Sequence, residues 1–129
     1  MKYIVTGAAG HLGVNLVGKI MLKKDAIVKA VLLPGESAVF EGAENVEIVR
    51  GDVTDRKFLE SVIEKDSTVI HLAGIIDICA GNKDRVYQVN VEGTKNVAEV
   101  SLEKGVARFV YTSSVHVIPP QNGVKMTEP

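Results

Sequence analysis

The sequence lacks the features that would place it in a membrane or on a nucleic acid. Its longest apolar stretches fall far short of the roughly 20 residues that span a bilayer. Met1 leads straight into a strand-like run, so we expect no secretory leader. The 15 basic residues balance 16 acidic residues, giving a formal net charge of −1. Because neither sign dominates, we expect no nucleic-acid partner and no attraction to anionic membranes.

Cysteine and tryptophan are scarce too: Cys79 is the single cysteine, and tryptophan does not occur. One cysteine cannot form an internal disulfide, which suits a reducing compartment, so we expect a cytoplasmic protein. We interpret Cys79 as a small packed residue, because no neighbour can be assigned to activate its thiol. With only three scattered histidines besides, the sequence predicts no metal site.

What the chain does contain is an alternation of two apolar periods over 129 residues, a length typical of one domain. We therefore predict a single domain over residues 1–129. Short apolar runs predict strands at 3–5, 26–33, 46–49, 69–73 and 109–111. Helical spacing predicts helices at 11–24, at 58–63 and from about 84 to 104. Either Thr54 or Asp55 is expected to cap the second helix.

Apolar strands that alternate with amphipathic helices are typical of a parallel sheet covered on both faces. Right-handed crossovers restrict such a sheet to a few doubly wound arrangements. We therefore predict an α/β fold of Rossmann type, with about five parallel strands in the order 3-2-1-4-5. A ligand is expected at the carboxyl ends of the strands, near the switch between the first and fourth strands.

Glycines with the spacing Gly-x-x-Gly-x-x-Gly mark the turn from the first strand into the first helix. Gly7 permits a tight turn, Gly10 lets a pyrophosphate approach the backbone, and Gly13 lets the helix pack against the strand. The helix N-terminus offers N–H groups to phosphates. Glycines kept only for turn geometry are the alternative. The strand before the loop, the helix after it and the parallel pattern beyond favour a dinucleotide site.

Four further segments follow the glycine loop (residues 6–13) in order. They are GDVTD at 51–55, HLAG at 71–74, NVEGTKN at 90–96 and FVYTSS at 109–114. From Lys2 to about Val117 the chain thereby resembles the extended short-chain dehydrogenase/reductase superfamily, NAD-dependent epimerase/dehydratase family. The segments at 69–77 and 111–114 look most like the 3β-hydroxysteroid dehydrogenase and dihydroflavonol reductase branch. The resemblance implies hydride transfer between a substrate C–OH group and nicotinamide, with substrates from sugar nucleotides to sterols and flavonols.

The resemblance also implies a set of cofactor-binding residues, each at a matching motif position. Besides Gly7, Gly10 and Gly13, they are His11 and Leu12 at the pyrophosphate, Asp52 and Val53 at the adenine, Leu72, Ala73, Gly74 and Ile75 at the nicotinamide ribose, and Asn90, which orders nearby backbone. Without the family, Asp52 is a turn residue at a strand end, and Asn90 belongs to the start of a helix.

Ser114 matches the family's catalytic serine or threonine, whose hydroxyl donates a hydrogen bond to the substrate oxygen as charge develops there. Ser113 is the alternative assignment, and the pair could instead cap the loop. Register with the strand favours Ser114. We interpret His71 as a structural residue at a strand end, whereas His116 fits either the surface or a pocket wall.

The family's catalytic Tyr-x-x-x-Lys pair has no counterpart in this sequence. We therefore expect the N-terminal part of a longer enzyme, without its substrate-binding region and with little or no catalysis of its own. The fifth strand would then have an open edge, which we expect to promote either dimerisation or aggregation, so a homodimer is one of two outcomes left open. Two other hypotheses are a non-catalytic dinucleotide-binding regulator of the same fold and a scaffold without a ligand.

The choice between NAD and NADP depends on the end of the second strand. An acidic residue there marks NAD by binding the ribose 2′-OH, and an arginine marks NADP. Neither occurs near Leu33, but Glu36 lies slightly further on, and the first arginine of the chain is Arg50. The sequence therefore favours NAD over NADP.

Overall fold

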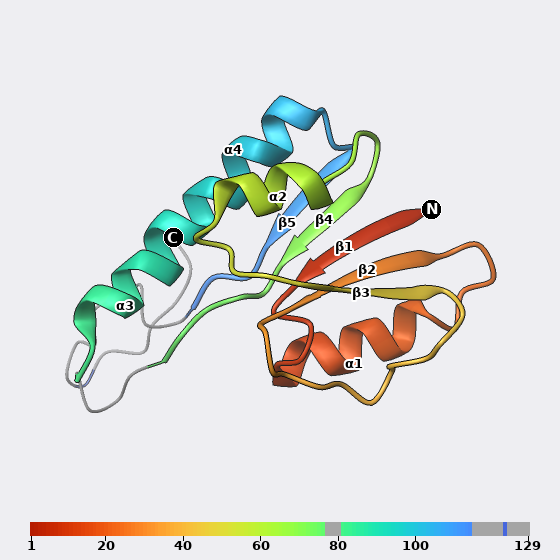
Figure 1. Ribbon diagram of the computed structural model, residues 1–129, viewed down its shortest axis with the longest axis horizontal. Coiled ribbons are helices and arrows are strands. Elements are labelled where there is room, and N and C mark those ends of the chain that lie inside the picture. The colour runs from red at the N-terminus through yellow and green to blue at the C-terminus, as the bar shows by residue number, and fades with distance from the viewer. Residues whose placement is uncertain (77–80, 115–122, 124–129) are drawn as a thin grey trace.

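The computed structural model describes residues 1–76, 81–114 and 123. Within these residues, one all-parallel sheet has the strand order β3-β2-β1-β4-β5, which confirms the predicted fold (Figure 1). The strands are β1 (Lys2–Thr6), β2 (Ile27–Leu32), β3 (Val46–Arg50), β4 (Thr68–His71) and β5 (Arg108–Tyr111). The helices are α1 (His11–Ile20), α2 (Arg56–Val62), α3 (Lys83–Tyr87), the π-helix η1 (Gln88–Gly93) and α4 (Thr94–Lys104).

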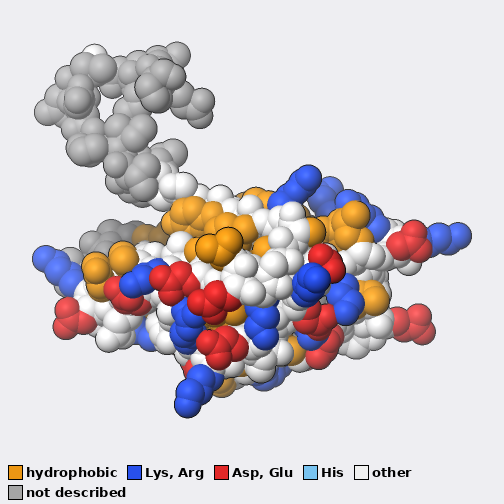
Figure 2. Space-filling model, turned by 90° about the horizontal axis from the view of Figure 1, so that it is seen from above, with side chains coloured by type: hydrophobic (Ala, Val, Ile, Leu, Met, Phe, Trp, Pro, Cys, Tyr) orange, Lys and Arg blue, Asp and Glu red, His pale blue; other side chains and the backbone are white. Residues whose placement is uncertain are grey.

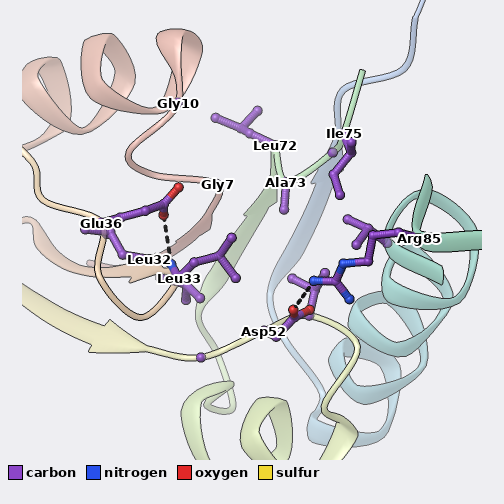
Figure 3. Close-up of a pocket in the computed structure, with 15 residues that line it drawn as sticks. Gly7, Gly10, Leu32, Leu33, Glu36, Asp52, Leu72, Ala73, Ile75 and Arg85 are labelled. Carbon is purple, nitrogen blue, oxygen red and sulfur yellow. Dashed lines mark hydrogen bonds and ion pairs between the residues drawn. The ribbon is translucent and has the colours of Figure 1, made fainter. Parts of the chain in front are cut away.

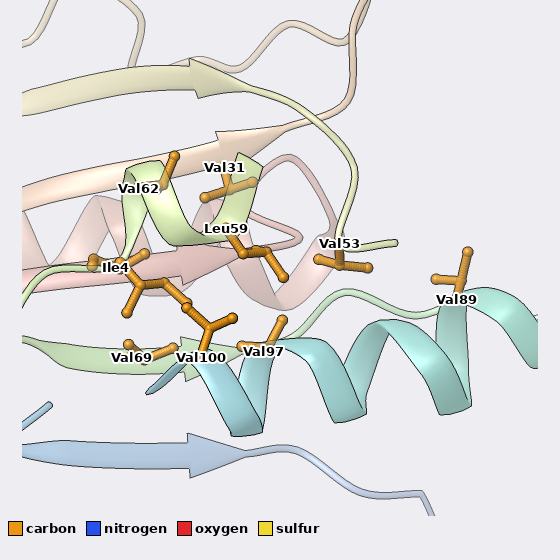
Figure 4. Close-up of a cluster of buried hydrophobic side chains, with 10 residues drawn as sticks. Ile4, Val31, Val53, Leu59, Val62, Val69, Val89, Val97 and Val100 are labelled. Carbon is orange, nitrogen blue, oxygen red and sulfur yellow. The ribbon is translucent and has the colours of Figure 1, made fainter. Parts of the chain in front are cut away.

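Each face of the sheet has its own hydrophobic core, because successive side chains of a strand point to opposite faces. Val5 of β1 belongs to the cluster that contains Val17 of α1. Its neighbour Ile4 belongs to the opposite cluster, with Leu59 of α2 and Val100 of α4 (Figure 4). All of these side chains are buried, each contributing about 1.5–3 kcal/mol to folding. Burial on both faces explains the nearly continuous apolar strands.

The register of the sheet brings several strand ends to one edge. Thr6, the last residue of β1, pairs with Val31 of β2 and with His71 of β4. The backbone N–H of Thr112 continues the ladder beyond β5 by donating to His71 O at 3.2 Å. The segments that follow β1, β2, β4 and β5 therefore leave the sheet side by side, which is the geometry of a ligand site at the carboxyl edge.

The helix ends follow local chemistry. Asp55, not Thr54, caps α2, since its Oδ1 accepts from the backbone N–H of Phe58 at 3.0 Å. Gly105 ends α4 in the left-handed conformation, with φ of 67°. In the described part of the chain, no helix combines the length and the apolar character needed to cross a bilayer. The face shown in Figure 2 carries acidic and basic side chains close together, in keeping with the balanced charge.

The long helix predicted from about residue 84 begins at Lys83 and contains a π-helical turn, η1, between α3 and α4. Gly93, at the end of η1, lies so close to Val53 that an added Cβ would come within 2.6 Å of its Cγ2. The apolar spacing of the sequence fits a regular helix equally well, so it did not predict the π turn. Such turns are frequent at functional sites.

Candidate functional site

A pocket opens at the carboxyl edge of the sheet, between the glycine loop and α3 (Figure 3). Its walls come from the ends of four strands and from the long helix. The lining residues are Gly7, Gly10, Val31, Leu32, Leu33, Glu36, Gly51, Asp52, Val53, Leu72, Ala73, Gly74, Ile75, Arg85 and Val89. The structure thus brings together predicted residues from three separate motifs: the glycine loop, the end of β3 and the end of β4.

Two of the three loop glycines are required by the fold itself. Gly7 has a positive φ of 68°, and an added Cβ would come within 2.7 Å of the backbone nitrogen of Ala73. At Gly13, which is buried at the start of α1, a Cβ would come within 2.2 Å of Gly7 O. These two glycines therefore let the loop, the helix and the segment after β4 pack closely, and Gly13 contributes to packing rather than to the pocket lining.

Gly10 differs because little in the fold requires a glycine there. Its φ of −72° and ψ of 171° suit any residue. An added Cβ would approach one atom, Gly7 O at 3.2 Å, and Gly10 lines the pocket just before α1 begins. The missing side chain keeps the backbone accessible beside the helix N-terminus, where phosphates bind well. His11 and Leu12 follow with exposed side chains and are not among the lining residues.

Asp52 presents a tightly held carboxylate at the end of β3. Its Oδ1 accepts from the backbone N–H and the hydroxyl of Thr54, at 2.9 and 2.8 Å. Its Oδ2 accepts from Nη2 of Arg85 at 2.5 Å. Partial burial acts to raise the pKa of Asp52, but the hydrogen bonds from Thr54 and Arg85 outweigh it and lower the pKa below its usual range. The group is therefore an ionised acceptor on the pocket wall.

Glu36 places a second carboxylate on the opposite side of the pocket (Figure 3). The chain turns after β2 through Gly35, whose φ is 88°. The turn brings Oε2 of Glu36 within 2.8 Å of the backbone nitrogen of Leu33, from which it accepts a hydrogen bond. An acidic group at this strand end is the arrangement that binds a ribose 2′-OH in NAD-binding folds.

Asn90, in the π turn, holds the segment that follows β4. Its Oδ1 accepts from the backbone N–H of Ile75 at 2.8 Å, and its Nδ2 donates to Ile75 O at 2.9 Å. One side-chain amide thus satisfies both polar groups of a residue that lies outside the sheet. Asn90 itself lies outside the pocket lining, and its contact with Ile75 fixes the wall formed by residues 72–75.

His71 sits fully buried behind the pocket, as a structural residue of β4. Its Nδ1 lies 2.6 Å from Oγ1 of Thr6, and its Nε2 lies 2.9 Å from Oγ1 of Thr94. Thr6 Oγ1 also accepts from the backbone N–H of Ala73 at 3.4 Å. Burial lowers the pKa of His71 to about 4, and Tyr111 stacks on its ring at 5.6 Å. The chain of hydrogen bonds links β1, β4 and α4.

The remaining predicted positions are one lining residue, Val53, and several residues that are not part of the pocket lining. Ser113 and Ser114 follow β5 with exposed side chains and are not among the lining residues. Val53 is buried and lines the pocket. Cys79 and His116 lie outside the described residues. Within the described ranges, no three histidine, cysteine, aspartate or glutamate side chains gather as metal ligands do.

Arg85 is a charged pocket residue that the sequence did not predict. It lies 33 positions from Asp52, and no spacing rule relates a residue at the start of one helix to the end of a distant strand. In the sequence, Arg85 is visible only as a basic residue of the predicted helix, five positions before Asn90. Its pairing depends on where the helix is placed against the sheet.

Solved structures of short-chain dehydrogenases/reductases and epimerases share this fold. A short-chain dehydrogenase/reductase superfamily protein from Agrobacterium tumefaciens, solved with bound NAD, has a TM-score of 0.76 and 29% identity over 92% of this chain and 34% of its own. An epimerase from Methanothermobacter thermautotrophicus has a TM-score of 0.81 and 31% identity over 96% of this chain and 39% of its own. The fold and site thus define a member of the short-chain dehydrogenase/reductase superfamily.

Within that superfamily, the family model for the 3-beta hydroxysteroid dehydrogenase/isomerase family matches residues 4–128, and the chain belongs to this family. Human 3 beta-hydroxysteroid dehydrogenase type 7 is 30% identical over 133 aligned residues, covering 93% of this chain and 34% of the relative. Sterol demethylase protein B of Methylococcus capsulatus is 32% identical over 114 residues, covering 88% of this chain and 34% of the relative. The chain spans about a third of the length of these curated relatives.

Proposed function

We propose that the carboxyl-edge pocket binds NAD. The observation that carries the proposal is the convergence of Gly10, Asp52 and residues 72–75 on one pocket, from three separate strand ends. The N-terminus of α1 and the bare backbone at Gly10 suit a pyrophosphate. The ionised Asp52 suits the exocyclic amine of adenine, which needs a hydrogen-bond acceptor. Residues 72–75, held by Asn90, would flank the nicotinamide ribose.

We further propose that this site serves hydride transfer with a secondary alcohol of the hydroxysteroid type, in a protein of the relatives' length. NAD, when bound, supplies a hydride acceptor at its nicotinamide ring. The role of Ser114 is to donate a hydrogen bond to the substrate oxygen. The sequence contains no Tyr-x-x-x-Lys pair. The 129-residue chain alone is therefore proposed to bind the cofactor without appreciable turnover.

A cytoplasmic location and self-association complete the proposal. The single cysteine supports a reducing compartment. Self-association is supported by β5, an edge strand in the described sheet whose Phe109, Val110 and Tyr111 are exposed. An exposed apolar edge strand is a common site of strand pairing between chains.

The carboxylate of Glu36 predicts that NAD binds more tightly than NADP, because it would repel a 2′-phosphate. Replacing Glu36 by glutamine removes this repulsion. The ratio of the NADP dissociation constant to the NAD dissociation constant is therefore expected to fall about tenfold. Calorimetric titration of the purified chain with each dinucleotide measures both affinities.

Glu44→Gln is the matched control, since Glu44 is exposed and does not line the pocket. This variant should keep the preference of the unmodified chain. Failure of the unmodified chain to bind either dinucleotide would refute the proposed function. Tighter binding of NADP than of NAD would refute the cofactor assignment alone.

A further inference from the structure

Arg85 occupies a position in the pocket that the strand-end motifs do not explain. Among the described residues that line the pocket it is the one cation. Figure 3 shows its side chain reaching from α3 toward Asp52, on the side of the pocket opposite Glu36. Asp52 is the candidate acceptor for adenine, and Arg85 contacts its carboxylate directly. Arg85 is therefore placed to control the direction in which this carboxylate points.

The two oxygens of Asp52 are engaged to different extents. Oδ1 accepts two hydrogen bonds, both from Thr54. Oδ2 accepts one, from Nη2 of Arg85 at 2.5 Å. A carboxylate oxygen accepts about two hydrogen bonds, so Oδ2 keeps one acceptor position while Arg85 fixes its direction. The pair therefore leaves room for one further donor.

Arg85 is itself held in place by the helix that forms this side of the pocket. Oδ1 of Asn82 caps α3 by accepting from the backbone N–H of Arg85 at 3.1 Å. The helix then runs through η1, where Asn90 fixes Ile75. One continuous helix thus positions both Asp52 and the wall after β4.

The ion pair is a weak candidate for a purely stabilising role. The Arg85 and Asp52 side chains are 37% and 26% exposed. Pairs with this much solvent contact contribute little to the free energy of unfolding. The pair does, however, fix the direction of the carboxylate, which matters for binding a hydrogen-bond donor.

We propose that Arg85 is a specificity-determining positioning residue for the adenine base. By holding Oδ2 of Asp52, it presents an ionised acceptor to the exocyclic amine and makes the pocket discriminate against bases that lack this donor. The inference rests on the proposed binding of NAD to this pocket.

The test compares NAD with nicotinamide hypoxanthine dinucleotide, which carries a carbonyl oxygen where adenine carries its amine. Arg85→Met removes the guanidinium but keeps an apolar stem, Arg85→Lys is the conservative change, and Arg108→Met is a matched control on β5, outside the pocket lining. Calorimetric titration of the purified chain gives each affinity. Arg85→Met is expected to weaken NAD binding about tenfold. The affinities for NAD and for the hypoxanthine dinucleotide should then become nearly equal.

Arg85→Lys should recover part of the discrimination, and Arg108→Met should leave it unchanged. In an Asp52→Asn background, Arg85→Met should remove no further discrimination, because both residues act through one contact. A purely structural role would weaken both dinucleotides equally, which would overturn the inference. Tighter NAD binding by Arg85→Met would also overturn it, since Arg85 would then compete with the base. Absence of NAD binding by the unmodified chain would overturn the proposed function as well.

Discussion

Replacing Gly13 by alanine is expected to lower the free energy of unfolding by about 3 kcal/mol. The added methyl group would lie 2.2 Å from Gly7 O and 2.6 Å from the Cα of Ala8. Both atoms belong to the backbone, so no side-chain rotation relieves the clash and α1 must move away from the glycine loop. Urea unfolding of the purified chain measures the loss.

Gly18→Ala is the matched control in the same helix. No atom lies within 4 Å of a Cβ built at Gly18. Alanine in a helix interior is more favourable than glycine by about 0.5–1 kcal/mol, so this variant should be slightly more stable than the unmodified chain. If Gly13→Ala unfolded at the same urea concentration as Gly18→Ala, the close packing of α1 against the loop would be wrong.

Acidification from about pH 7 to pH 4 is expected to cost the chain about 3 kcal/mol of stability through His71 alone. Burial lowers the pKa of His71 from 6.5 to about 4 in the folded chain. Between these values the unfolded chain binds a proton that the folded chain does not, so stability falls as the pH drops through this window. Below about pH 4 both states are protonated, and the contribution of His71 stops changing.

Urea unfolding at several pH values in this window measures the slope. His71→Gln keeps a donor and an acceptor near Thr6 and Thr94 but does not titrate, so its stability should vary much less with pH. Lys2 and Lys29 lower the pKa of Glu64 from 4.5 to about 2. Glu64 therefore changes the stability of the chain only at lower pH, between about pH 4.5 and pH 2. Equal slopes for the variant and the unmodified chain between about pH 6.5 and 4 would show that His71 is not buried as described.

The sheet could be predicted from sequence because its signals are local and redundant. Each strand is a short apolar run, and the alternation with helices restricts the topology to a few choices. The roles of Gly7 and Gly13 in backbone packing were also predictable, since their spacing follows from the geometry of a strand–loop–helix unit. Asp52 and residues 72–75 were placed by family motifs, and the structure brings them to one pocket.

What the sequence did not predict depends on contacts between distant elements. In the π turn, Gly93 packs closely against Val53, and the side chain of Asn90 forms a hydrogen bond with the backbone of Ile75. The apolar spacing of the sequence does not predict either contact. The pairing of Arg85 with Asp52 depends in turn on the placement of that helix. Hydrogen-bond partners of buried polar groups, such as Thr94 for His71, are likewise set by the packing.

The central claim, that the carboxyl edge of this sheet binds NAD, is tested most directly by titrating NAD into isotopically labelled chain and following the backbone amide signals by NMR. The signals of Gly7, Gly10 and Ala73 should shift. Those of Asp25 and Glu47, toward the opposite edge of the sheet, should not. Shifts confined to the opposite edge, or none at saturating NAD, would contradict the account.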